Sequence, residues 1–141
     1  MKHLHTLIKL KKREVDVLRK QLGHLTEQRE FLEQLHEMLE NDLTTEVRLS
    51  ETLTQMSGFF GQFSDAIKKK QALINEQIRN IDRQMDIISE QMRVVFSEQK
   101  TYEIVLERKK AEAIRLEEKR EQEFMDELSS RKHGNEISNG F

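Results

Sequence analysis

Apolar residues recur along this chain with a mean spacing of 3.5 residues, in two separate stretches. From Leu4 to Leu43, in alternating steps of four and three, nine of twelve positions are apolar. From Ile67 to Leu116, the same stepping finds twelve apolar positions of fifteen. A heptad repeat sustained over this length is typical of a left-handed coiled-coil seam. The pattern therefore predicts an all-α protein with two long seam-forming helices.

Glycines indicate where these helices end, because the chain contains five of them and no proline. Residues 62–133 contain no glycine, whereas Gly58 and Gly61 lie close together in a phenylalanine-rich segment. Turn residues of this kind interrupt regular structure. We therefore expect the following elements: a helix at 3–56, a turn at 57–64, a helix at 65–130 and a disordered tail at 133–141.

A connection of about eight residues favours antiparallel neighbours, so residues 1–132 are expected to form a single coiled-coil hairpin. Seams of this kind pair in registers seven residues apart. The favoured register places Leu22 opposite Val95 and Leu43 opposite Ile74, and the next register remains an alternative. The carboxyl-terminal helix end, beyond about residue 120, then overhangs. Polar residues interrupt the seam and are expected to set its register: Lys11, Arg29, His36, Gln71, Gln99 and Lys109.

Composition excludes several classes of protein. Only 35% of residues are apolar and 35% are charged, so a thick globular core is excluded. The chain has no cysteine, which excludes disulfides and cysteine metal sites. No apolar run approaches the length of a membrane span or a secretory signal, so we expect a cytoplasmic protein.

Catalytic chemistry is poorly supplied. The sequence has no glycine-rich phosphate loop and no HExxH motif. His3 and His5 fall on different faces of a helix, so they cannot share a metal ion. Two helices alone offer no concave pocket that would desolvate carboxylates and shift their pKa. We therefore expect no enzyme activity, no cofactor and no metal.

Charge is unevenly distributed along the chain. Residues 1–20 carry seven basic and two acidic side chains, whereas residues 21–66 carry two basic and nine acidic ones. A basic end suits an acidic partner surface. Nucleic acid is a rival partner, but the pI is near 6.2 and no aromatic residue precedes Phe31. We therefore favour a protein partner and expect no nucleic acid.

Three of the seven phenylalanines, Phe59, Phe60 and Phe63, lie in the expected turn. Two helices cannot bury all three, so an exposed apolar tip is predicted, and such patches usually mark contacts. Capping of the last seam layer and insertion into a membrane surface are the alternatives, the second kept open by Lys68, Lys69 and Lys70. We favour contact with a partner protein and expect no direct insertion into a membrane.

The residues Met1 to Asp16, the basic run Arg108 to Glu112, the chain length and the hairpin resemble the flagellar export protein FliJ family. The resemblance covers nearly the whole chain apart from 133–141. It implies a cytoplasmic component of the bacterial flagellar type III export apparatus, peripherally associated with the inner membrane. In this family a hairpin similar to a rotary-ATPase stalk links the hexameric export ATPase FliI to the cytoplasmic domain of the export gate protein FlhA. Some members also bind export chaperones.

The resemblance also implies two sets of binding residues. The ATPase-binding set comprises Lys9, Lys11, Lys12, Arg13, Arg19, Arg115, Lys119 and Arg120. The gate-binding set comprises Leu43, Val47, Phe59, Phe60, Phe63, Ile74 and Ile78. Three other functions remain open from the residues alone: an injectisome-type secretion stalk, a generic coiled-coil scaffold or homodimer, and a basic-arm nucleic-acid binder.

Overall fold

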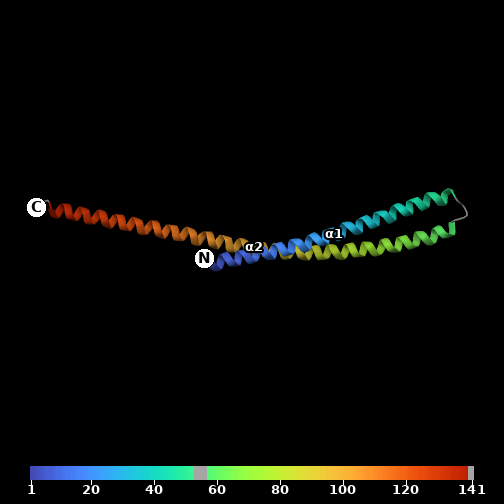
Figure 1. Cartoon of the computed structure of the whole chain (residues 1–141), viewed down its shortest axis with the longest axis horizontal. Coiled ribbons are helices and arrows are strands. Elements are labelled where there is room, and N and C mark those ends of the chain that lie inside the picture. The colour runs from blue at the N-terminus through green and yellow to red at the C-terminus, as the bar shows by residue number, and fades with distance from the viewer. Residues whose placement is uncertain (53–56, 140–141) are drawn as a thin grey trace. The chain divides into compact units, whose positions relative to one another are not determined.

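Two helices make up the protein. The computed structural model describes residues 1–52 and 57–139, with side chains described for 1–51 and 60–135. Helix α1 spans Lys2–Thr52 and helix α2 spans Ser57–Asn139 (Figure 1). No strand occurs among these residues. The predicted all-α hairpin of two long helices is confirmed.

The predicted boundaries of the second helix are wrong at both ends, whereas residues 53–56 of the first predicted helix lie outside the described residues. Residues 57–64, expected as a turn, form the first turns of α2, and 133–139, expected as a disordered tail, continue its last turns. Residues 140–141 lie outside the described residues. Glycine lowers helix propensity by about 1 kcal/mol but does not forbid a helix. Gly61 accordingly has no positive φ, and a Cβ built on it would meet nothing within 4 Å.

The chain divides into two compact units. The hairpin unit comprises residues 13–96, and the terminal unit comprises residues 1–12 together with 97–141. Both helices contribute to each unit, because α1 and α2 each pass from one to the other.

In the hairpin unit, α1 and α2 lie side by side and run antiparallel (Figure 1). Its buried apolar residues are seam positions of the heptad pattern: Val15, Ile67, Ile74 and Ile81. Gln71 is also buried on this seam. A seam one residue wide on each helix accounts for the small core, because the described side chains on the opposite faces of both helices are exposed.

The register of the hairpin differs from the favoured one by one heptad. Arg29 contacts Asp82, and Glu40 contacts Gln71. Seven residues back along α1 from Arg29 correspond to seven residues forward along α2 from Asp82, so Leu22 lies level with Ser89, next to the seam residue Ile88, rather than with Val95. By the same counting, Leu43 lies level with Lys68, next to the seam residue Ile67, rather than with Ile74. The early start of α2 at Ser57 agrees with this register, because both place earlier residues of α2 opposite α1.

In the terminal unit, side chains of α2 are buried only as far as Leu106. Ile8, Gln99 and Leu106 are buried there, and Lys11 Nζ lies 2.5 Å from Glu98 Oε2. Every side chain from 107 to 135 is exposed. The predicted overhang is therefore present, but it begins near 107 rather than 120, and the one-heptad change in register accounts for about half of this difference.

Candidate interaction surfaces

The basic end of α1 contains both exposed and packed lysines. Lys9 and Lys12 are exposed in the terminal unit. The Lys11 side chain is only 19% exposed and forms an ion pair with Glu98 across the two helices. The Lys11 ammonium group is therefore paired within the terminal unit, whereas the side chains of Lys9 and Lys12 are exposed to solvent.

Three other cations of the ATPase-binding set lie on the exposed stretch 107–135 of α2, which we call the extension. Arg115 is exposed and pairs with Glu112 one turn earlier, Nη2 to Oε1 2.6 Å. This contact raises the pKa of the Arg115 guanidinium and lowers the pKa of the Glu112 carboxyl. Lys119 and Arg120 are exposed as well. The extension also exposes apolar side chains, namely Ile114, Leu116, Phe124, Met125 and Leu128.

The structure brings Lys9, Lys11 and Lys12 into the same unit as Arg115, Lys119 and Arg120. Arg13 and Arg19 fall in the hairpin unit instead. Both side chains are exposed. Arg19 forms an ion pair within α1, with its Nη1 3.6 Å from Asp16 Oδ1.

The gate-binding set falls in the hairpin unit, and its members differ in accessibility. Val47 and Phe63 are exposed, while Leu43 and Phe60 are half-buried. Ile74 is 6% exposed, and Ile78 is half-buried on the same seam. The side chain of Phe59 lies outside the described residues. Among the described side chains, Val47 and Phe63 are therefore the best placed for contact with a partner.

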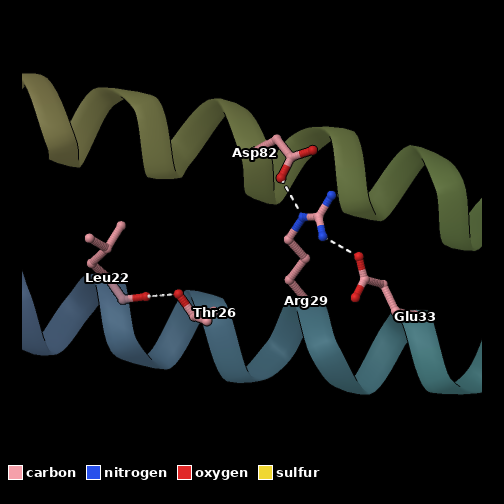
Figure 2. A network of polar contacts seen from close by, with 5 residues as sticks. All are labelled: Leu22, Thr26, Arg29, Glu33 and Asp82. Atoms are coloured by element: carbon pink, nitrogen blue, oxygen red, sulfur yellow. Dashed lines mark hydrogen bonds and ion pairs between the residues drawn. The ribbon is translucent and has the colours of Figure 1, made fainter.

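The seam of the hairpin unit contains a polar network centred on Arg29 (Figure 2). Its Nε donates to Asp82 Oδ1 on α2 at 2.7 Å, and its Nη1 donates to Glu33 one turn along α1. Hydrogen bonding to Asp82 is the main reason that the pKa of Arg29 is raised, and Glu33 adds to it. One side chain thus connects both helices at a defined level.

Other polar seam residues also have partners. Gln71 donates to Glu40 Oε2 at 2.8 Å, linking α2 to α1. Gln99 donates to Glu103 Oε1 at 3.0 Å, and this bond, with Lys100 adding to it, lowers the pKa of the Glu103 carboxyl. His36 is half-buried, whereas Lys109 is exposed and lies beyond the paired part of the seam.

The hairpin unit has a further surface that the sequence reasoning missed. A groove of about 540 Å³ runs between α1 and α2 and is lined by Glu27, Gln28, Phe31, Leu32, Gln77, Asn80 and Ile81. Phe31 is 65% exposed at its edge. Other exposed apolar residues follow at multiples of seven along each helix: Val17, Phe31 and Met38 on α1, and Leu73, Ile87 and Val94 on α2. We call the side of the hairpin that carries these residues the groove face. A second set of apolar residues with heptad spacing, starting at Val17 and at Leu73, is the sequence signal for it.

Among the described residues, no group of three or more His, Cys, Asp or Glu side chains is placed to hold a metal ion. Within the same residues, no helix is both long and apolar enough to cross a membrane.

Comparison with known proteins identifies a family. No curated protein and no solved structure gives a significant match to the chain. The family described as flagellar FliJ protein matches residues 1–138, which includes both helices almost entirely. The chain therefore belongs to the flagellar FliJ protein family, and the protein is a component of the flagellar export apparatus.

Proposed function

We propose that this protein acts as a stalk that links the export ATPase FliI to the export gate protein FlhA. The observation that carries the proposal is the family match over residues 1–138. Charge and burial add support, because five exposed cations of the ATPase-binding set lie in the terminal unit, whereas the exposed Phe63 of the gate-binding set lies in the hairpin unit. A connector needs two unlike surfaces for two partners.

The ATPase end is assigned to the terminal unit. Lys9 and Lys12 on α1 and Lys119 and Arg120 on the extension offer exposed cations. An extension whose side chains pack on nothing else in the described residues is suited to entering the pore of a ring. Cations on its surface favour binding to acidic residues and raise the association rate at low salt.

The gate end is assigned to the hairpin unit near the ends of the two helices. Val47 and Phe63 are exposed apolar residues there, and exposed apolar patches often mark protein contacts. Export chaperones are proposed as a further partner, on the family resemblance alone. The proposed place of action is the cytoplasmic side of the inner membrane, at the export apparatus.

The ATPase assignment is tested with a variant that leaves the seam intact. Lys9→Glu and Lys12→Glu reverse two exposed charges while Lys11 keeps its ion pair with Glu98. We expect weaker binding to the FliI ring and weaker stimulation of ATP hydrolysis. Lys68→Glu with Lys69→Glu is the matched control, because it reverses two exposed charges in the hairpin unit.

Normal ATPase binding by the Lys9→Glu, Lys12→Glu variant would show that the end assignment is wrong. The gate assignment has its own measurement, namely binding of the FlhA cytoplasmic domain to a Phe63→Glu variant. The flagellar system is favoured over an injectisome stalk because the matching family is the flagellar one. A pull-down from a flagellated bacterium that recovers neither FliI nor FlhA would contradict the stalk role.

A further inference from the structure

The apolar seam of the hairpin unit does not by itself distinguish between two registers. In the observed register, the seam residue of α2 nearest to Leu22 is Ile88. If α2 moved along α1 by one heptad, which is about 10 Å, Leu22 would meet Val95 instead. Seam residues still face the partner helix after such a step, because seven residues make two turns of a coiled-coil helix. Apolar packing therefore allows both registers.

The seam around Leu39 favours the second register. In the observed register its nearest seam residue on α2 is Gln71, which is buried and donates to Glu40. One heptad on, Leu39 would meet the apolar Ile78. Gln71 would meet Glu46, whose carboxylate can accept the same kind of hydrogen bond. The step therefore removes a polar residue from an apolar layer and still leaves its amide a partner.

The contact between Arg29 and Asp82 opposes the step. In the second register Arg29 would be level with Ser89, which has no charge to pair with the guanidinium group. The two side chains of the contact are 35% and 46% exposed, so solvent weakens their attraction. One partly exposed ion pair thus holds the observed register against a seam that accepts both.

The first turns of α2 contain the residues that the step would release. In the second register Thr52, the last residue of α1, would be level with Ala66, so residues 57–63 would join the connection between the helices. These residues include Gly58 and Gly61, and glycine favours a helix less than any other residue except proline. Unwinding this segment is therefore cheaper than unwinding any other two turns of the hairpin unit.

A step in the opposite direction lacks both advantages. Leu32, whose nearest seam residue is now Ile78, would meet Gln71, so a polar residue would enter an apolar layer. The longer connection would have to come from residues 48–52 at the end of α1, which contain no glycine. The direction of the step is therefore defined by the sequence of the seam and by the position of the glycines.

We propose that the hairpin unit is a two-register device, in which α2 slides along α1 by one heptad when Arg29 releases Asp82. Residues 57–63 leave the helix during the step, and the rest of the seam pairs again. Steps of one packed element past another belong to the general repertoire of protein switches. A partner that binds one register more tightly shifts the population toward it. The device is a property of the chain alone and does not depend on the stalk role.

Disulfide trapping reads the register, because the chain has no cysteine of its own. Leu22→Cys with Ile88→Cys should link in the observed register, and Leu22→Cys with Val95→Cys in the second. The control pair, Leu22→Cys with Ile81→Cys, reports the opposite step. Only links within one chain are counted, on non-reducing gels. The first pair should link fastest, and the second should link at least about tenfold faster than the control.

Exchange of two residues should move the preferred register. Asp82→Ser with Ser89→Asp carries the carboxylate for Arg29 one heptad along α2 and leaves the composition unchanged. In this exchanged chain the pair at 22 and 95 should link faster than the pair at 22 and 88. Asp82→Ser alone is the matched control and should raise linking at 22 and 95 by a smaller factor. Circular dichroism checks that both variants remain helical.

Either of two results would overturn the proposal. One is a chain with the native Arg29 and Asp82 in which the pair at 22 and 95 links no faster than the control pair at 22 and 81. The other is an exchanged chain that still links only at 22 and 88. Binding of the cysteine-free exchanged chain to FliI is measured in parallel, so that the stalk function is judged separately from the change of register.

Discussion

Arg29 Nε on α1 lies 2.7 Å from Asp82 Oδ1 on α2, and this contact selects one register among those that the apolar seam allows. In the register one heptad away, Arg29 would be level with Ser89 and would lose its carboxylate on α2. The contact between Glu40 and Gln71 is consistent with the same register. Polar residues in this seam therefore help to select the register of the two helices, as they do in other coiled coils.

Replacement of Asp82 should weaken the hairpin more than replacement of Glu33. Both carboxylates bind Arg29, but only Asp82 joins the two helices. Asp82→Ala is therefore expected to lower the thermal midpoint, and Glu33→Ala to lower it less, since it removes only a contact within α1. Melts followed by circular dichroism compare the two. Equal midpoints for the two variants would mean that the contact across the helices adds no stability.

Ile74→Ala is expected to destabilise the protein by about 2–4 kcal/mol, because it removes buried seam atoms and leaves a cavity. Leu73→Ala is the matched control, since Leu73 is the next residue but 61% exposed, and it should change stability by less than about 0.5 kcal/mol. Urea unfolding measures both. If Ile74→Ala also lost FlhA binding while remaining folded, its assignment to the gate-binding set would gain support.

Gly23→Ala should stabilise the protein by about 0.5–1 kcal/mol, because alanine restricts the unfolded chain and favours helix. Gly23 is exposed within α1, and a Cβ built on it would meet nothing within 4 Å. Gly134→Ala should have a smaller effect near the end of α2, where helices fray. The unfolding midpoints in urea compare them. A destabilised Gly23→Ala protein would indicate a contact at this surface that the monomer does not contain.

Acid should remove the stabilisation that Glu103 provides. Its pKa is lowered below 4.5 in the folded chain, first by the hydrogen bond from Gln99 and then by Lys100. A lowered pKa means that the stabilisation is present above pH 4.5 and is lost as the pH falls through the folded-state pKa. The native chain should therefore melt above Glu103→Gln at pH 7, with the gap closing as the pH falls through the lowered folded-state pKa of Glu103. A gap that does not vary with pH would mean that charge on Glu103 is unimportant.

Truncation after residue 108 should separate folding from ATPase binding. The side chains from 109 to 135 are all exposed, so their removal should leave the unfolding midpoint of the paired helices nearly unchanged. Binding to FliI should be strongly reduced, because Arg115, Lys119 and Arg120 are lost. A truncated chain that stimulates FliI fully would assign the ATPase contact to α1 alone.

The heptad pattern of the sequence correctly predicts which apolar residues are buried between the two helices. Seam residues such as Val15, Ile67 and Ile81 are buried as the heptad pattern predicts, because a helical stripe faces one partner wherever that partner lies. The groove face was missed although Val17, Phe31 and Met38 share the same repeat. Its residues are fewer than those of the seam, and only the geometry brings them beside those of α2.

The sequence by itself determined the helical nature of this protein, its two seams, its family and the polarity of its charges. These follow from local spacing and from composition, which act along one helix at a time. Only the tertiary structure decided the register, the early start of α2 at Ser57 and the length of the extension. The physical reason is that apolar layers a heptad apart pack almost equally well. The choice falls to a few polar contacts between residues far apart in the chain, of which Arg29 with Asp82 is one.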